Sequence, residues 1–479
     1  MSNDPPSTPP KPRQRRGGNL IALAAAQVLR LGSGLAVNVL LMRMLGVDGY
    51  GVYGYILTLV GLGAFGATLG MFNLINRELS RDPERTGELV ATGLAAVTGL
   101  SILTGFLVVG WAGVMDGRPE VIGAAALAAI ALGLQSLASI PEAACHAHQR
   151  MALSVAGQIA GRLTLVIGTA SLLYLDLGVA AVFAAQVLDA LITLVVIWQM
   201  YRRHLSSYTL RPKWSAIRSL TRRSIPFGLN LLFGSIYLSV DVLLLAELKD
   251  DTEVGVYRGA VMLIALFPVI ANTLNRGLFP RMARHLGDRE AAGGELRFAS
   301  RVLLAVSIPA AVGGLMTAEP LMVFFGGDAF AVSALPFMVM APLLPLRFLN
   351  NSLGMTLSTL NRQDDRTRGV AVAACVNLVA NFLVIPRWGA VGAAATTLGT
   401  EVLLMAWFRW HVRPLVTGVG LPESILRTSL PAVAMAAVLW WLPQWHVLVT
   451  VTVGGLVYVV GGLATGAWHP RDLKRLRRV

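Results

Sequence analysis

The chain has 479 residues, of which 55% are hydrophobic and only 14% are charged, and its mean hydropathy is +0.64. This composition excludes a soluble fold and predicts lipid as the main solvent. The formal net charge of +14 would favour nucleic acid as a partner of a soluble chain, but the placement of the charges explains them better. We therefore expect no nucleic-acid partner.

Apolar segments of 18 to 27 residues follow one another along the whole chain. Hydrocarbon forces every backbone N–H and C=O to pair internally, and a spanning helix needs about 20 apolar residues. We therefore predict an all-α membrane protein with about 14 transmembrane helices. The predicted spans are 18–42, 52–76, 88–112, 121–141, 152–175, 179–200, 224–246, 255–279, 299–325, 332–357, 369–386, 389–408, 425–443 and 446–466.

Lys and Arg are concentrated in alternate connections between these spans. With the N-terminus inside, the cytoplasmic segments hold 32 of the 40 basic residues, the outside loops hold 4 and the spans hold 4. This bias predicts a multi-pass protein of the cytoplasmic (inner) membrane with both termini cytoplasmic. The predicted parts are a disordered cytoplasmic tail (1–17), an N-lobe of six spans (18–200), a cytoplasmic inter-lobe loop (201–223), a C-lobe of six spans (224–410), two further spans (425–466) and a basic cytoplasmic tail (467–479).

A short internal repeat supports the two lobes. Gly51-Val52-Tyr53-Gly54 opens the second span, and Gly255-Val256-Tyr257-Arg258 opens the eighth. Four matching positions can arise by chance, but both copies follow an outside loop. Six spans repeated in the same orientation predict two lobes related by an axis along the membrane normal, with a central cavity between them.

Four arginines fall inside predicted spans, where an arginine at the bilayer centre costs about 2.5 to 3.5 kcal/mol on insertion scales. They are Arg30, Arg162, Arg258 and Arg347. Polar residues on the same helix faces or on neighbouring spans accompany them: Gln27 and Asn38 near Arg30, Gln158 beside Arg162, Asn230 on span seven, Asn272 on the side of Arg258, and Asn350 with Asn351 beside Arg347.

These arginines have two interpretations. In the first they form structural ion pairs with Asp189, Asp241 or Glu401, or extend their side chains to the membrane surface. In the second they line a water-filled cavity between the lobes. Four guanidiniums against three buried acids would leave that cavity positive, as a phosphate-bearing substrate requires.

The segment Leu45-Gly46-Val47-Asp48-Gly49-Tyr50-Gly51-Val52-Tyr53, followed by Leu69-Gly70 and Asn76-Arg77-Glu78, resembles the opening of the polysaccharide-flippase (Wzx-type) branch of the multidrug/oligosaccharidyl-lipid/polysaccharide exporter superfamily. Asn377 and Asn381, followed by the segment 385–394, resemble the same branch. The resemblance extends over nearly the whole chain. It implies a MATE-like fold of two six-helix lobes and two C-terminal helices.

The resemblance also implies a function. The protein would move a polyprenyl-pyrophosphate-linked oligosaccharide from the inner to the outer leaflet during synthesis of O-antigen, capsule or exopolysaccharide, and would break no bond, so it is not expected to be an enzyme. Membrane lipids and a polysaccharide polymerase are the other expected partners. Relatives in the superfamily can use an ion gradient, and Asp241, Asn377, Asn381 and Thr397 are similar to a Na⁺ or H⁺ coupling site.

Other functions compete with this one. A lipid II flippase of the same superfamily would differ in substrate, and a MATE-type small-molecule or cation antiporter would favour an acidic or aromatic cavity. An oligosaccharide polymerase or ligase usually carries a large outer loop, which this sequence lacks. No Walker motif occurs, and Cys145, His146 and His148 have no fourth ligand nearby, so we expect no cofactor and no metal beyond a coupling ion.

Overall fold

The computed structural model describes residues 16–205, 212–268, 271, 282–284, 288–418, 420–442 and 446–467, with side chains from Gln27 onward except at 230, 231, 233, 234, 237, 238 and 422. All regular structure in these ranges is helical, which confirms the predicted all-α membrane fold. The helices are α1 (Arg16–Thr68), α2 (Met71–Arg81), α3 (Thr86–Met115), α4 (Pro119–Ala147), α5 (Met151–Tyr174), α6 (Gly178–Leu205), α7 (Trp214–Leu248), α8 (Asp251–Ile264), α10 (Arg289–Met316), α11 (Ala318–Gly326), α12 (Ala334–Met340), α13 (Leu343–Thr359), α14 (Gln363–Val412), α15 (Leu421–Trp441) and α16 (Val447–Thr465), with 3₁₀ turns at Pro83–Arg85 and Asp328–Ser333.

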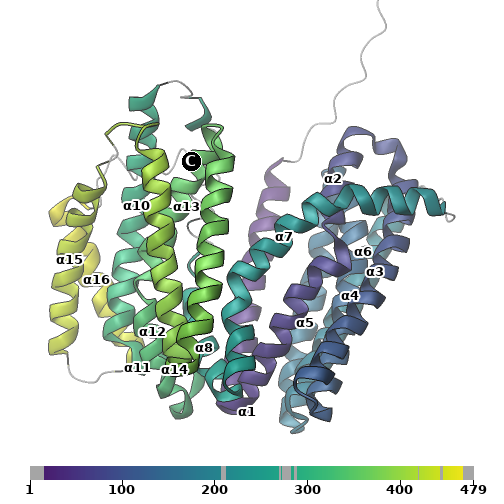
Figure 1. Cartoon of the computed structure of the whole chain (residues 1–479), viewed down its shortest axis with the longest axis horizontal. Helices are drawn as coiled ribbons and strands as arrows, with labels where there is room; N and C mark the ends of the chain where they lie inside the picture. The colour runs from purple at the N-terminus through teal and green to yellow at the C-terminus, as the bar shows by residue number, and fades with distance from the viewer. Residues whose placement is uncertain are drawn as a thin grey trace, which may run out of the picture.

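The helices form two bundles, as Figure 1 shows. Helices α1 to α6 make the N-lobe, α8 and α10 to α16 make the C-lobe, and α7 passes from one to the other. In the described ranges, nine helices are long and apolar enough to cross a membrane, or ten if the bent region 328–359 counts as one span. The chain is therefore a multi-pass membrane protein.

Two of these helices turn back on themselves at a glycine. Gly46 in α1 has φ 68° and ψ −170°, and Gly389 in α14 has φ 49° and ψ −132°, backbone conformations that glycine adopts without a steric penalty. The Tyr50 hydroxyl consequently lies 2.7 Å from Asn38 Oδ1, whereas a straight helix would separate these residues by about 18 Å. Tight turns thus replace the outside loops expected around these two positions.

Both turns lie at the same end of the molecule, the lower end in Figure 1. We call this end the turn side. The opposite end, where α6 finishes and α7 begins, is the linker side.

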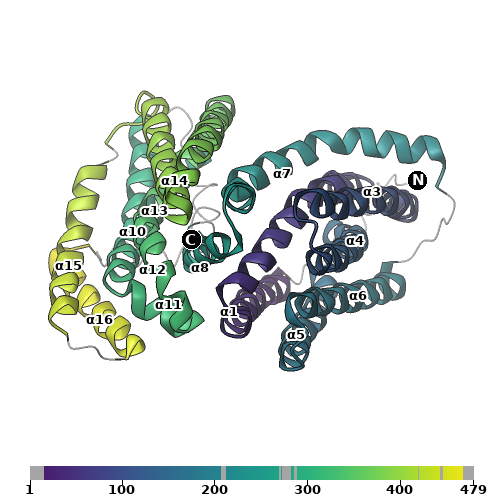
Figure 2. The ribbon, with the colours of Figure 1, turned by 60° about the horizontal axis from the view of Figure 1, so that its bottom comes forward.

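Helix α7 starts inside the predicted inter-lobe loop. Its first turns, from Trp214, run across the linker side of the N-lobe before the helix passes down between the lobes (Figures 1 and 2). Leu220 is buried there against α2 and α3 residues, while Arg218 and Arg222 are exposed. The stretch is amphipathic and rich in arginine, so its hydropathy does not mark it as helix. This is why the sequence analysis placed it in a loop that ends at residue 223, whereas α7 begins at Trp214.

Two predicted spans are interrupted in the C-lobe. The expected helix 299–325 is divided at Thr317 into α10 and α11, and the expected helix 332–357 bends by 44° between α12 and α13, where Pro342 precedes α13. A proline removes a backbone donor and disfavours helical geometry before it, which accounts for the bend. Nearly all of the predicted tails, 1–17 and 467–479, lies outside the described residues.

Candidate functional site

A polar cavity of about 280 Å³ lies within the N-lobe, between α1, α4, α5 and α6. Its polar lining residues are Arg30, Gln135, Glu142, Gln158, Arg162, Asp189 and Thr193. Three of these, Arg30, Gln158 and Arg162, are among the predicted substrate-binding residues. The structure therefore brings two of the four intramembrane arginines together in one pocket, which we call the N-lobe pocket.

Close packing of α5 on α6 fixes one wall of this pocket. Gly161 permits the contact, because an added Cβ would overlap Asp189 and Thr193 of α6. The adjacent Arg162 lies 3.8 Å from the Asp189 carboxylate, and Thr193 donates a 3.4 Å hydrogen bond to the same carboxylate. Only 6% of the Asp189 side chain is exposed, so this pair is largely withdrawn from water while a third of Arg162 stays accessible.

Glu142 is the pocket residue that the sequence analysis missed. Its carboxylate accepts a 2.6 Å hydrogen bond from Gln158 Nε2 and lies 3.6 Å from His146 Nε2. The predicted fourth span ended at residue 141, one position before Glu142, whereas α4 continues to Ala147. With Glu142 and Asp189 opposite Arg30 and Arg162, the described pocket lining is formally neutral rather than positive.

Arg30 reaches the pocket from α1. Its side chain is exposed and donates a hydrogen bond to Gln27 of the preceding turn. Asn38, expected on the same polar face, is occupied elsewhere: its Oδ1 accepts from Tyr50 and its Nδ2 donates to the Gly34 carbonyl at 2.7 Å. Asn38 thus holds the turn at Gly46 and does not line the pocket.

Arg258 lies away from the N-lobe pocket, where α8 packs on α1. Its side chain covers Gly54, at which an added Cβ would overlap it, and the guanidinium lies beside the Tyr50 hydroxyl. Its buried Nε has no hydrogen-bond partner in the described structure. Arg258 is therefore an inter-lobe arginine.

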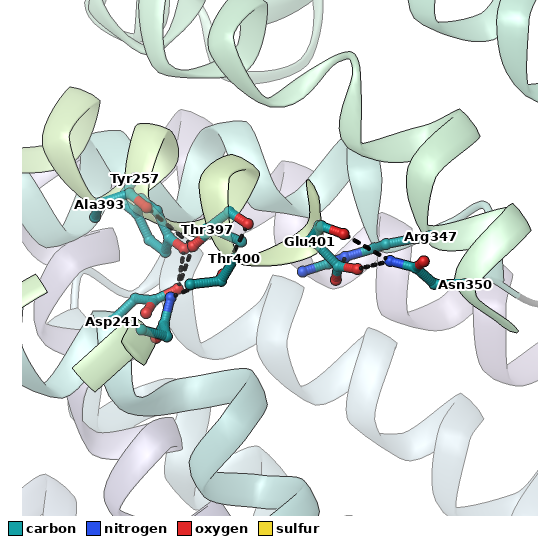
Figure 3. Close-up of polar contacts among 9 residues, drawn as sticks. Asp241, Tyr257, Arg347, Asn350, Ala393, Thr397, Thr400 and Glu401 are labelled. Atoms are coloured by element: carbon teal, nitrogen blue, oxygen red, sulfur yellow. Dashed lines mark hydrogen bonds and ion pairs between the residues drawn. The ribbon is translucent and has the colours of Figure 1, made fainter. Parts of the chain in front are cut away.

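Arg347 belongs to the C-lobe and forms the structural ion pair that was one of the two interpretations. Its Nε lies 2.9 Å from Glu401 Oε1, and Asn350 donates to Glu401 Oε2 at 2.8 Å (Figure 3). Of the remaining predicted substrate-binding residues, the side chain of Asn230 and the whole of Asn272 lie outside the described residues.

The four residues predicted as a cation site do meet in the C-lobe. The Asp241 carboxylate of α7 accepts hydrogen bonds from Thr397 at 2.8 Å and from Asn381. Asn381 in turn donates to Asn377 Oδ1 at 3.0 Å. The turn at Gly389 makes this possible, because it brings Thr397 in the second half of α14 back beside the asparagines in the first half. We call these residues, with Tyr257, the Asp241 cluster; Figure 3 shows its Asp241, Tyr257 and Thr397.

The cluster is almost fully buried and its acid has neutral partners. Asp241 is 4% exposed and Asn381 0%. Tyr257 of α8, which the sequence analysis did not select, donates to Asp241 at 2.6 Å; its place in the Gly-Val-Tyr repeat was the available signal. No arginine pairs with Asp241 in the described structure. One carboxylate with hydroxyl and amide oxygens is a donor set that suits a hard cation.

The Gly-Val-Tyr repeat marks a symmetric contact between the lobes. A Cβ on Gly51 would overlap the carbonyl oxygen of Asp251, and a Cβ on Gly255 would overlap the carbonyl oxygen of Val47. In each case the carbonyl belongs to the residue four positions before the other glycine. Each copy of the repeat therefore packs on the other, as at a two-fold interface.

Polar contacts surround these glycines on the turn side. Thr252 donates to Asp48 at 2.6 Å, Arg118 pairs with Asp251 at 2.7 Å, and Arg43 donates to the Phe325 carbonyl at 3.3 Å, at the end of α11. The two lobes are therefore joined at the turn side.

We expect Gly51→Ala to open the turn side, because the new methyl group has no space against α8. A cysteine placed at Thr252 should then react faster with a membrane-impermeant thiol reagent than in the parent protein. Gly32→Ala is the matched control, since a Cβ there meets nothing within 4 Å. Equal reactivity in the two variants would mean that the glycine contact does not hold the lobes together.

Comparisons with known proteins agree with this architecture. The family model described as "Polysaccharide biosynthesis protein" matches residues 17–286, and the MatE model matches residues 226–400. Two Haloferax volcanii proteins are similar in sequence. "Probable low-salt glycan biosynthesis flippase Agl15" is 22% identical over 74% of each chain, and "Probable flippase AglR" is 25% identical over 48% of each chain.

Solved structures share the fold at low sequence identity. The lipid II flippase MurJ in an inward closed conformation aligns with a TM-score of 0.76, 14% identity and coverage of 95% of this chain and 99% of that one. An inward-facing MATE multidrug transporter aligns with a TM-score of 0.63, 13% identity and coverage of 83% and 98%. Since the first family model covers more than half of the sequence, the chain belongs to the polysaccharide biosynthesis protein family.

Proposed function

We propose that the protein is a flippase that moves a polyprenyl-pyrophosphate-linked oligosaccharide from the inner to the outer leaflet of the cytoplasmic membrane for polysaccharide synthesis. The observation that carries this proposal is the N-lobe pocket, where Arg30 and Arg162 line a polar cavity inside an apolar bundle. Guanidiniums bind phosphate oxygens through charge-assisted hydrogen bonds. The family membership and the flippase names of the two relatives support the same class of substrate.

The position of the pocket suits a headgroup that enters from the linker side. Arg30 precedes the turn at Gly46 by 16 residues, which places it about 24 Å from the turn side. The pyrophosphate would bind beside Arg30 and Arg162, the sugars would occupy water between the lobes, and the prenyl tail would stay in lipid. No covalent bond changes in this process.

Transport then requires the lobes to separate at the turn side and approach at the linker side. The glycine contact and the polar bonds around it hold the turn side shut in this structure. Breaking these contacts while the lobes approach at the linker side would rock two rigid lobes against each other and expose the pocket alternately to the two sides.

We propose the cytoplasm as the location of the linker side, because that side carries most of the basic residues. A cysteine at Lys249, on the turn side, should react with an impermeant reagent in intact cells, and one at Lys213, on the linker side, should react after permeabilisation alone. Both residues are exposed, so accessibility within the protein is matched. The opposite labelling pattern would reverse the topology.

We also propose that the Asp241 cluster couples transport to a Na⁺ or H⁺ gradient. Asp241 lies on α7, which connects the lobes, and its partners come from α8 and both halves of α14. A cation bound there would join these three helices, and its release would loosen them. The cluster is thus suited to shift the balance between lobe arrangements.

A MATE-type antiporter is the second candidate, favoured by the match of residues 226–400 to the MatE model. A lipid II flippase is a third and differs in the glycan alone. Competition in proteoliposomes separates them: we expect a prenyl-pyrophosphate-linked oligosaccharide to inhibit its own labelled transport, and an organic cation to have no effect. Inhibition by the cation, or transport of lipid II in preference to other glycans, would favour the corresponding alternative.

A further inference from the structure

The two arginines of the N-lobe pocket already have two carboxylates beside them, so an anion that binds there meets negative as well as positive charge. Arg162 faces Asp189 at 3.8 Å, and Arg30 lines the same cavity as Glu142. A pyrophosphate diester brings two negative charges into this formally neutral space. Placing them beside two carboxylates in a cavity inside an apolar helix bundle is unfavourable unless an acid is neutralised.

Glu142 is the acid best placed to change its charge. Asp189 already pairs with Arg162, accepts from Thr193 and is nearly buried. Glu142 has no arginine within ion-pair distance in the described structure; its partners are the neutral amide of Gln158 and the imidazole of His146. Its side chain is 21% exposed, so water can deliver a proton to it.

We propose that the N-lobe pocket takes up one proton on Glu142 when an anionic headgroup binds beside Arg30 and Arg162. The proton comes from the buffered solvent: its bond to a buffer acid or hydronium ion breaks, and an O–H bond forms on the Glu142 carboxylate. The second carboxylate oxygen still accepts from Gln158, while the new O–H can donate to a phosphate oxygen. Glu142 thereby changes from a repelling group into a hydrogen-bond donor, and one of the two headgroup charges is offset inside the bundle.

Other ionisable groups lie beside Glu142 or line the same cavity, and the test must distinguish them from Glu142 as the group that takes up the proton. They are Arg30 on α1, His146 on α4 itself, Arg162 on α5 and Asp189 on α6. No ionisable side chain of α2 or α3 is among the residues that line the cavity. Arginine keeps its proton under all conditions of interest, so His146 and Asp189 are the alternative acceptors.

The test is calorimetric titration of the full-length protein in lipid nanodiscs with a soluble short-chain prenyl pyrophosphate esterified to one sugar, whose phosphates do not titrate near neutral pH. Titration in two buffers of different ionisation enthalpy gives the number of protons taken up. We expect about one proton per bound probe for the parent protein, and an affinity that falls by up to about tenfold per pH unit as the pH rises. Glu142→Gln should bind the probe without proton uptake and without this pH dependence.

The proposal rests on the proposed function, and the experiment separates their failures. Absence of probe binding by parent protein that elutes as a folded species in size-exclusion chromatography would overturn both. Binding without proton uptake would overturn the Glu142 proposal and leave the flippase proposal standing. Uptake that persists in Glu142→Gln but disappears in Asp189→Asn or His146→Gln would assign the proton to that residue instead. Glu120→Gln, at the other end of α4, is the matched control and should behave as the parent protein does.

Discussion

Arg30→Ala should abolish most transport of the lipid-linked oligosaccharide while leaving a folded protein in the membrane. The side chain is exposed to the N-lobe pocket and bonds only to Gln27 among its described neighbours, so its removal leaves no buried acid without a partner. A lost charge-assisted contact to phosphate is worth about 1.5 to 3 kcal/mol. Apparent substrate affinity should therefore fall by about ten- to a hundredfold.

Complementation of a flippase-deficient strain at matched protein level measures this effect. Arg203→Ala is the matched control, because Arg203 is an exposed arginine of α6 that lies outside the pocket. Arg162→Ala is harder to interpret, because it leaves the buried Asp189 without its arginine. Loss of transport by this variant could then come from loss of folding instead of loss of substrate binding. Full surface polysaccharide in the Arg30→Ala strain would make Arg30 dispensable for the headgroup.

Asp241→Asn should retain headgroup binding yet lose stimulation by an ion gradient. The carboxylate supplies the one formal charge of the Asp241 cluster, and an amide in its place offers an oxygen ligand but no negative charge to balance a buried cation. Because its described partners are Tyr257, Thr397 and Asn381, the variant leaves no buried cation unpaired. One donor loses its acceptor, so we expect a moderate stability loss of about 1 to 3 kcal/mol rather than misfolding.

Transport in proteoliposomes with imposed Na⁺ or H⁺ gradients, together with thermal unfolding of the purified protein, measures both effects. Asp364→Asn, an exposed acid at the start of α14, is the control for loss of a carboxylate. If parent transport ignores both gradients and Asp241→Asn is grossly destabilised, the cluster is a structural network and the coupling proposal fails.

Much of the fold follows from the sequence because lipid imposes a simple rule. Long apolar runs must be helices, and the predicted fold class is confirmed on that ground. The Asp241 cluster, apart from Tyr257, was also predictable as a group: Asn377 and Asn381 are spaced four residues apart, one helical turn, and the turn after Ile385-Pro386 returns the chain so that Thr397 lies beside them. Resemblance to a known family, rather than spacing, identified Asp241 as their partner across 136 positions of sequence.

The prediction from sequence was wrong where a helix carries charged residues. Glu142 lies in the last turns of a helix whose apolar run had ended, so its place in the pocket could not be read from hydropathy. The first turns of α7 carry exposed arginines on one face and Leu220 on the other, a pattern that a window average treats as loop. All four intramembrane arginines look alike in the sequence, but tertiary packing places them in three environments. These are the N-lobe pocket, the contact between the lobes, and an ion pair inside the C-lobe.

The most direct test of the account is movement of a polyprenyl-pyrophosphate-linked oligosaccharide between leaflets in liposomes that contain the purified full-length chain. The glycan is labelled in both leaflets, and the fraction open to an impermeant glycosidase is followed in time. We predict that inner-leaflet glycan becomes accessible faster than in protein-free liposomes, and that Arg30→Ala removes this gain at equal protein incorporation. Accessibility that never exceeds that of protein-free liposomes, although the protein is folded and incorporated, would contradict the proposed flippase function.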